Sequence, residues 1–295
     1  MNATWMDSSR FFGQAGRVDA RRALASRPGL SFLETSGGRV RVRHVPSESG
    51  PRLLLATDGP NVIEHTDALL RELDGRADVV VFEPPGTGAS EPASGFDFTL
   101  AAFVRACGDV LAKVGPRTLV FPCYLGFIGQ QLAREMGEQV TRLVTPQTPA
   151  WADLGTWADG VDRRRVVRTP FLGQALMTLR RRSVAESWYR ASASDRRFRE
   201  PFLAAANEAF SLGGCFCLAS LMQGFERSAP PSREPLSIPV AIPWGAKDRT
   251  HRRSTPTRSF PNADVITFDD CGHCPDLEDP RRFATWLLDW HGETR

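Results

Sequence analysis

Short, unbroken apolar runs constrain this chain more than any other feature of its sequence. Residues 52–56 and 78–82 read RLLLA and DVVVF, and residues 140–144 (VTRLV) are strand-like. Segments with helical spacing lie between these runs, at 62–73 and 98–114. Strands that are apolar along their length are buried on both faces, which is typical of parallel sheets covered by helices. The sequence therefore predicts an α/β fold with a mostly parallel central sheet and helices on both faces.

The alternation of strands and helices stops in the second half of the chain. From about residue 149 to 231 the sequence has helical spacing and no convincing strand run. We therefore predict a core domain formed by residues 1–148 and 236–295, with a helical cap inserted at 149–235. The other expected elements are a polar N-terminal extension at 1–28, a hairpin at 30–34 and 39–44, strands at 117–121, 238–243 and 263–268, and helices at 126–136 and 280–291.

Composition and charge limit the classes of function. The chain has 295 residues, of which 41% are apolar and 24% charged, and a net charge of +3. Its dense arginine clusters, at 163–168 and 180–182, are interpreted as solvated helix faces, so we expect no nucleic-acid partner. No apolar run reaches the roughly 20 residues of a membrane span, and the first residues lack a secretory apolar segment. We therefore expect a cytoplasmic protein that binds no membrane.

Three segments outside the predicted cap carry motifs. Residues 244–248 read WGAKD after a predicted strand, residues 272–280 read GHCPDLEDP before the last predicted helix, and residues 83–90 read EPPGTGAS. Together they resemble the α/β-hydrolase family, in particular its capped members: haloalkane dehalogenases, epoxide hydrolases and small esterases. The resemblance implies that Asp248 is the acid and His273 the base of a catalytic triad.

The nucleophile of that triad belongs in the segment VFPCYLGFIG, residues 120–129. One register of the family's motif places Tyr124 at the tip of the strand-to-helix turn. The other places Cys123 there, with Gly126 and Gly129 three and six residues further on. We favour Cys123, because a thiolate is small and strongly nucleophilic, whereas a tyrosine ring is bulky and its pKa is near 10.

The resemblance also implies an oxyanion hole made of two backbone amides. One is the N–H of Tyr124, which follows the favoured nucleophile. The other comes from the turn TDGP at residues 57–60, where two alignments are open. One alignment would use Pro60, which has no N–H, and the other uses Gly59, so we prefer Gly59.

Four further residues are expected to contact the substrate. Asp58 and His65 lie in or near the presumed oxyanion turn, and Trp151 lies in the predicted cap. Leu125 stands where the family usually has glycine, and Phe121 is also large. We therefore expect an elbow that is slightly opened or a pocket that is narrowed.

Paired cysteines also suggest a metal site. Cys271 and Cys274 have the C-x-x-C spacing of zinc ligands, but no second pair stands at a suitable spacing. Cys215 and Cys217 have only one residue between them and belong to the predicted cap. We therefore expect no metal and no cofactor, and six cysteines that are mostly free thiols.

A cysteine nucleophile narrows the chemistry. Dehalogenases and epoxide hydrolases need an aspartate, because water cleaves the ester that aspartate forms and does not cleave a thioether. We therefore predict a Cys-His-Asp hydrolase or acyltransferase that acts on an ester, lactone or thioester. Its partner would be a small-molecule substrate, either free or carrier-bound. Whether the chain forms a homodimer stays open. Two alternatives also stay open: an acid–base lyase, cyclase or isomerase, and a binding protein without turnover.

Overall fold

A mixed sheet of nine strands forms the centre of the structure, a computed structural model that describes residues 19–293. The strand order is β1–β2–β4–β3–β7–β8–β10–β11, with β6 beside β2. From β4 to β11 all neighbours are parallel, which confirms the mostly parallel sheet, while β2 is antiparallel to β1 and to β4. The strands are β1 Leu30–Thr35, β2 Gly38–Val45, β3 Arg52–Ala56, β4 Asp78–Phe82, β6 Glu91–Pro92, β7 Arg117–Val120, β8 Val140–Val144, β10 Val240–Gly245 and β11 Asp264–Phe268.

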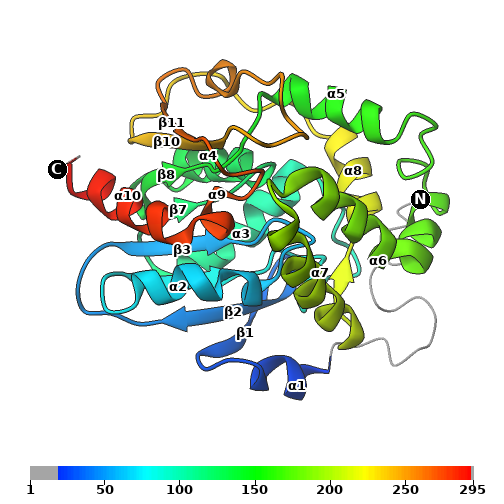
Figure 1. The fold of residues 1–295 in the computed structure, drawn as a ribbon, viewed down its shortest axis with the longest axis horizontal. Helices are drawn as coiled ribbons and strands as arrows, with labels where there is room; N and C mark the ends of the chain where they lie inside the picture. Colours follow the sequence, from blue (N-terminus) through cyan, green and yellow to red (C-terminus); the bar gives the residue numbers. More distant parts are fainter. Residues whose placement is uncertain (1–18, 294–295) are drawn as a thin grey trace.

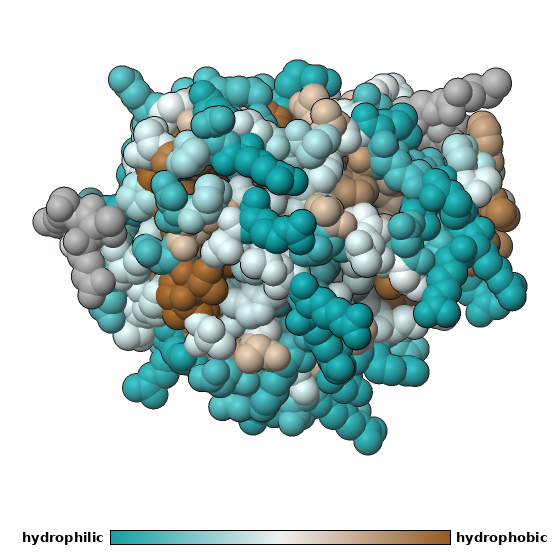
Figure 2. Space-filling model, turned by 90° about the horizontal axis from the view of Figure 1, so that it is seen from above, coloured by the Kyte–Doolittle hydropathy of each residue, from teal (hydrophilic) through white to brown (hydrophobic). Residues whose placement is uncertain are grey.

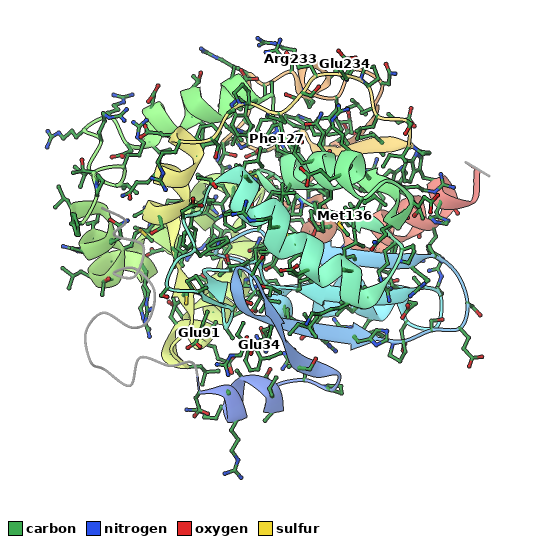
Figure 3. All side chains as sticks on the ribbon, turned by 180° about the vertical axis from the view of Figure 1, so that it is seen from behind. Glu34, Glu91, Phe127, Met136, Arg233 and Glu234 are labelled. Atoms are coloured by element: carbon green, nitrogen blue, oxygen red, sulfur yellow. The ribbon has the colours of Figure 1, made fainter. Side chains whose placement is uncertain are left out.

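Each central strand sends alternate side chains to opposite faces of the sheet, and helices cover both faces. On β3, Leu54 packs into the apolar core shared with α3 and α4, whereas Leu53 and Leu55 pack into the core shared with α2 and α10. Figure 1 shows α2 and α10 crossing one face. Figure 3 shows the other face from behind, with Phe127 labelled on α4 and Met136 labelled directly after the helix. These helices are α2 Asp67–Leu73, α3 Leu100–Val114, α4 Leu125–Glu135 and α10 Pro280–Glu293.

Predicted and observed element boundaries differ at a few places. The helix predicted at 98–114 begins only at Leu100, because Phe98 has a φ of 60° and the Thr99 side chain caps the helix by accepting from the amide of Ala102. The segment 62–73 is a 3-10 turn, Ile63–Thr66, followed by α2. In the predicted N-terminal extension the structure contains α1, Ala20–Ala25, and residues 1–18 of that prediction lie outside the described residues.

The segment between β8 and β10 is mainly helical, and its helices lie together at one end of the molecule (Figure 1). They are α5 Trp151–Val161, α6 Leu172–Ser192, α7 Arg196–Ser211 and α8 Leu218–Glu226. The helical spacing of this segment gave no convincing strand run, and the structure contains one very short strand. A two-residue strand, β9 Cys215–Phe216, pairs antiparallel with β5, Thr87–Gly88, and ties the inserted helices to the turn after β4. Two-residue strands carry no apolar period, so the sequence pattern cannot indicate them.

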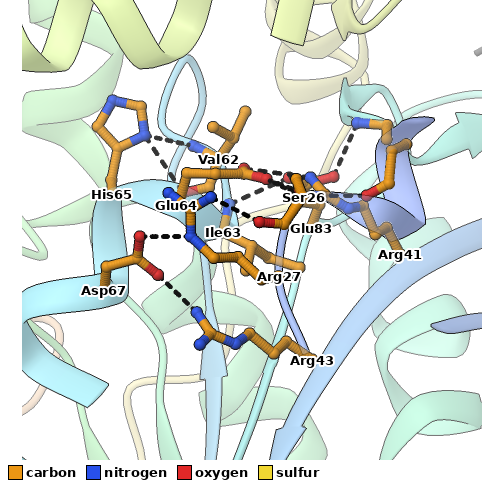
Figure 4. Close-up of polar contacts among 12 residues, drawn as sticks. Ser26, Arg27, Arg41, Arg43, Val62, Ile63, Glu64, His65, Asp67 and Glu83 are labelled. Carbon is orange, nitrogen blue, oxygen red and sulfur yellow. Dashed lines mark hydrogen bonds and ion pairs between the residues drawn. The ribbon is translucent and has the colours of Figure 1, made fainter. Parts of the chain in front are cut away.

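A buried ion-pair network connects the turn after β4 to the β1–β2 hairpin (Figure 4). Arg41 on β2 pairs with Glu83 at 3.1 Å and also with Glu64. Glu83 additionally accepts the amides of Ile63 and Ala89, at 3.0 and 2.7 Å. Burial raises the pKa of Glu83 to about 7, against the opposing charge of Arg41. The network fixes the EPPGTGAS segment and the start of the 3-10 turn, and therefore also the TDGP turn that precedes it.

The molecular surface is mostly polar. Figure 2 shows a face on which hydrophilic residues predominate and hydrophobic ones form small separate patches. Among the helices that the structure describes, none has the length and apolar character that crossing a bilayer requires.

Candidate active site

The turn between β7 and α4 forms a tight elbow with Cys123 at its tip. Cys123 has a φ of +51°, a conformation that is rare for residues other than glycine, whereas Tyr124 has ordinary helical angles. Two hydrogen bonds hold the strained residue: its amide donates to the carbonyl of Pro146 at 2.8 Å, and Thr148 Oγ1 donates to its carbonyl at 2.9 Å. Backbone strain of this kind concentrates at functional sites, and the geometry favours the Cys123 register.

Two glycines let the helix after the elbow pack closely on its neighbours. A Cβ at Gly126 would lie 2.3 Å from Thr148 Oγ1, and one at Gly129 would lie 2.6 Å from a methyl group of Leu143 on β8. Both distances are shorter than any real contact. Close packing therefore requires glycine at both positions, three and six residues after Cys123.

His273 and Asp248 come together as a buried hydrogen-bonded pair. Asp248 follows β10, and its Oδ2 lies 3.0 Å from His273 Nδ1. Gln147 and Thr250 donate further hydrogen bonds to the same carboxylate, at 2.9 and 2.8 Å. Burial opposes ionisation of Asp248, but the charge and hydrogen bond of His273 and the backbone amide of Thr250 lower its pKa to about 2. The carboxylate is therefore charged at neutral pH and fixes the orientation of the imidazole.

The thiol of Cys123 lies close to that imidazole. The Cys123 sulfur and one ring nitrogen each of His251 and His273 all lie within 4.8 Å of one another. Burial raises the pKa of the Cys123 thiol to about 11, and the charge of Asp58 adds to the rise, whereas His273 and the Tyr124 amide act in the opposite direction. At neutral pH the thiol is therefore protonated and needs a base to react.

Asp58 lies on the other side of the imidazole. Its Oδ2 is 3.4 Å from His273 Nε2, and its side chain is only 14% exposed. Burial works to lower the pKa of His273, but Asp248, Cys123 and Asp58 together raise it well above its usual value. The imidazole is thus flanked by two carboxylates, one at each nitrogen.

His251 is a site residue that the sequence analysis missed. It is buried, and its Nε2 lies 3.9 Å from Cys123 Sγ. Burial and the charge of His273 lower the pKa of His251 to about 4, so the ring is neutral at physiological pH. The only signal in the sequence was its place three residues after Asp248, which matches no motif.

The two predicted oxyanion-hole amides lie at the same cavity wall as the thiol. Gly59 and Tyr124 line the cavity together with Cys123. No described residue accepts a hydrogen bond from the Gly59 or the Tyr124 amide, and the Tyr124 amide acts to lower the pKa of the neighbouring Cys123 thiol. Both donors are therefore available to an atom that approaches the sulfur from the cavity.

A largely apolar cavity of about 600 Å³ separates these residues from the inserted helices. Its walls come mainly from α5, α6 and α8, and its polar end lies at exposed residues of α6. Besides Asp58 and Thr250 at its floor, the polar lining residues are Asp162, Arg180, Ser183 and Ser187. The apolar walls include Leu154, Trp157, Ala158, Trp188, Phe216, Leu221 and Phe225.

Of the four residues expected to contact a substrate, the structure brings only Asp58 to this cavity. Leu125 lines a small neighbouring pocket, and Trp151 packs on Tyr124 and on aromatic neighbours. His65 is buried elsewhere: its Nδ1 accepts the Val62 amide at 3.0 Å, and its Nε2 lies 2.9 Å from the carbonyl of Phe202. These hydrogen bonds give His65 a structural role.

The comparisons with known proteins agree with this architecture. A family model described as "Alpha/beta hydrolase family" matches residues 62–286. None of the curated proteins matches the chain.

Similar solved structures include an epoxide hydrolase from Vigna radiata, with 14% identity, a TM-score of 0.73, and coverage of 90% of this chain and 97% of that one. An esterase from Thermogutta terrifontis has 19% identity, a TM-score of 0.68 and coverage of 90% and 98%. A haloalkane dehalogenase from Bradyrhizobium elkanii has 14% identity, a TM-score of 0.67 and coverage of 90% and 96%. Likeness at these identities shows the fold.

Proposed function

Because the chain belongs to the alpha/beta hydrolase family, we propose that it is a cysteine-dependent hydrolase or acyltransferase acting on an ester or thioester. The observation that carries the proposal is the strained Cys123 at the elbow, beside the His273–Asp248 pair. A backbone held at a φ of +51° costs free energy, and presenting a nucleophile to a cavity is the role that such elbows have.

The chemistry begins with the thiol. The Cys123 proton passes to the His273–Asp58 pair as the sulfur attacks the substrate carbonyl, and a C–S bond forms. The carbonyl oxygen takes the negative charge, which the amides of Gly59 and Tyr124 stabilise. Collapse of this intermediate breaks the bond to the leaving group, which receives the proton, and leaves an acyl thioester on Cys123. Water or another acceptor then attacks this thioester and gives up its proton to the same His273–Asp58 pair. The C–S bond breaks, and the departing Cys123 sulfur takes that proton back as the thiol.

The cavity suggests the substrate class. Its apolar walls suit an acyl chain or another apolar group, since burying each methylene is worth about 0.8 kcal/mol. A thioester is favoured over an amide, because exchange between two thioesters is nearly thermoneutral. Arg180 and two serines on α6 form the polar end, where the head group of a substrate, free or carrier-bound, would lie.

Acyl thioesters of increasing chain length test the proposal. We expect kcat/KM to rise with chain length until the cavity is filled, and Cys123→Ala to abolish turnover. The matched control is Cys107→Ala, which removes a buried thiol of α3 that is not part of the cavity wall. Equal turnover by the parent protein and Cys123→Ala would exclude the covalent route.

The contact between Asp58 and His273 favours a second candidate, which is proton transfer without a covalent step. A carboxylate 3.4 Å from an imidazole nitrogen can accept a proton from a substrate carbon while His273 donates one elsewhere. Such a lyase or isomerase would survive Cys123→Ala and lose its activity with Asp58→Asn. The covalent route requires the opposite response to Cys123→Ala.

A further inference from the structure

Three metal-binding side chains from separate loops meet at the floor of the cavity. Cys123 comes from the elbow after β7 and His251 from the loop after β10. His273 comes from the loop between β11 and the short helix α9, Pro275–Glu278. Their ligand atoms all lie within 4.8 Å of one another, and all three residues are buried. No other group of three metal-binding side chains was found among residues 19–293.

We propose that Cys123, His251 and His273 form a binding site for one thiophilic divalent cation, such as zinc. Tetrahedral zinc, with a Zn–S distance of about 2.3 Å and a Zn–N distance of about 2.0 Å, places its sulfur and nitrogen ligands roughly 3.5 Å apart. The observed distance from Cys123 Sγ to His251 Nε2 is 3.9 Å, a few tenths of an ångström longer. Thiolate and imidazole are also the donors that zinc prefers.

The surroundings of His273 match those of a metal-bound histidine. Its Nδ1 lies 3.0 Å from Asp248 Oδ2 and 3.1 Å from Thr250 Oγ1, which leaves Nε2 facing the cluster. That Nε2 is buried and makes no well-aligned hydrogen bond, and Asp58 Oδ2 lies 3.4 Å from it as an ion pair. A carboxylate on one nitrogen and a metal on the other is the usual arrangement of zinc-binding histidines, because the carboxylate fixes the tautomer and makes the imidazole more basic.

A further anionic group lies beside the three ligands. Asp58 Oδ2 lies 3.4 Å from His273 Nε2 but is not part of the cluster of ligand atoms that all lie within 4.8 Å of one another, so Asp58 places negative charge beside the site. Binding releases the Cys123 proton and the proton on His273 Nε2 to solvent, and the resulting thiolate together with the nearby Asp58 carboxylate balances the two positive charges of the cation. The rings of Trp157 and Trp188 lie beside His251 and His273, so the site has apolar walls and one side open to the cavity.

This site is argued from geometry alone and does not depend on the proposed acyl transfer. It differs from the sequence-based expectation of no metal. That expectation rested on C-x-x-C spacing, whereas these three ligands lie far apart in the sequence. If Cys123 is also the nucleophile, a bound cation would occupy its sulfur. Zinc should then protect the thiol from alkylation, and a chelator should restore its reactivity.

The test uses the full-length protein, reduced and treated with a chelator, which is then titrated with Co²⁺ as a spectroscopic substitute for zinc. We expect one equivalent to bind, with a sulfur-to-cobalt charge-transfer band in the near ultraviolet and d–d bands of tetrahedral intensity. Zinc should displace the cobalt. His251→Gln should weaken binding by about tenfold or more, and Cys123→Ser should remove the charge-transfer band. The matched control is His44→Gln, which changes a half-exposed histidine of β2.

Two outcomes would overturn the proposal: cobalt binding without a sulfur band, or an unchanged affinity in His251→Gln whose circular dichroism shows a native fold. If His251→Gln fails to fold, Cys123→Ser still tests the proposal, because it differs from the parent protein by one atom. Acyl transfer is measured separately, in the presence of chelator, so failure of the metal site and failure of the proposed function are distinguishable.

Discussion

Asp58 adds a second carboxylate to a site that already contains Asp248, and its charge acts on the thiol. Because the negative charge of Asp58 helps to raise the pKa of Cys123, Asp58→Asn should lower that pKa and increase the thiolate fraction at a given pH. We expect alkylation of Cys123 by iodoacetamide at pH 7.5 to be several-fold to about tenfold faster in the variant. The rate is measured by mass spectrometry in the presence of chelator.

Asp74→Asn is the matched control, since it removes one negative charge from an exposed position. Its alkylation rate should equal that of the parent protein. A rate for Asp58→Asn that is unchanged or slower would show that Asp58 does not act on the thiol by its charge.

Single residues of the site were predictable only where a family motif contains them. Asp248 and His273 stand in motifs, and the structure places them 3.0 Å apart as the resemblance implied. His251 belongs to no motif, and its approach to Cys123 depends on how the loop after β10 folds back over the elbow. His65 lies close to the oxyanion turn in sequence, but the side chain turns away to the carbonyl of Phe202.

The elbow and α4 depend on the absence of a side chain at Gly126. Gly126→Ala would place a methyl group against Thr148 Oγ1, at a starting distance of 2.3 Å, so the helix or the threonine must move. Overpacking of this kind typically costs about 1–3 kcal/mol of unfolding free energy. We expect this loss in urea denaturation, together with a fall in Cys123 reactivity.

The double variant Gly126→Ala/Thr148→Ala checks the cause of that loss. If the clash with Thr148 is responsible, the two changes together should cost less than the sum of the single changes. Strictly additive losses would contradict the assigned contact.

Strands were easier to predict than helix ends or the inserted segment. The ranges predicted for β3 and β4 agree with the structure because their apolar runs are buried and end at turns, and the range predicted for β8 also agrees. The start of α3 depends on the backbone of Phe98, which no periodicity encodes. The helices α5 to α8 were expected as a group, whereas the cavity between them and the elbow depends on long-range packing that sequence spacing does not specify.

At the scale of the whole molecule, the buried Glu83 makes stability depend on pH. In the folded protein its pKa is about 7, whereas the ordinary value in an unfolded chain is near 4.5, so the folded state retains this proton over that interval. The contribution of Glu83 to stability is therefore present at low pH and is lost as the pH rises from about 4.5 to 7. For one proton, the unfolding free energy falls by at most about 1.4 kcal/mol per pH unit.

Glu83→Gln mimics the protonated carboxyl and should remove this part of the pH dependence. Urea denaturation at pH 5 and pH 7.5 should show that the parent loses more stability than Glu83→Gln between the two values. Glu135→Gln, an exposed change on α4, should follow the parent. A parent that gains stability relative to Glu83→Gln as the pH rises would contradict the shifted pKa.

The cavity between core and inserted helices should set the size of the acyl group. Ala158→Trp on α5 would fill part of it and exclude the longest chains. We expect the optimum of kcat/KM to move to shorter acyl thioesters, with each excluded methylene costing up to about fourfold. An unchanged chain-length profile would place the substrate outside this cavity.

The central claim, that Cys123 carries the acyl group, is tested most directly by intact-mass measurement after mixing the protein with an acyl thioester. Our account predicts a mass increase of one acyl group, mapped to Cys123, that decays as product forms and is absent from folded Cys123→Ala. Turnover of the same thioester by Cys123→Ala, with no adduct on the parent protein, would contradict it.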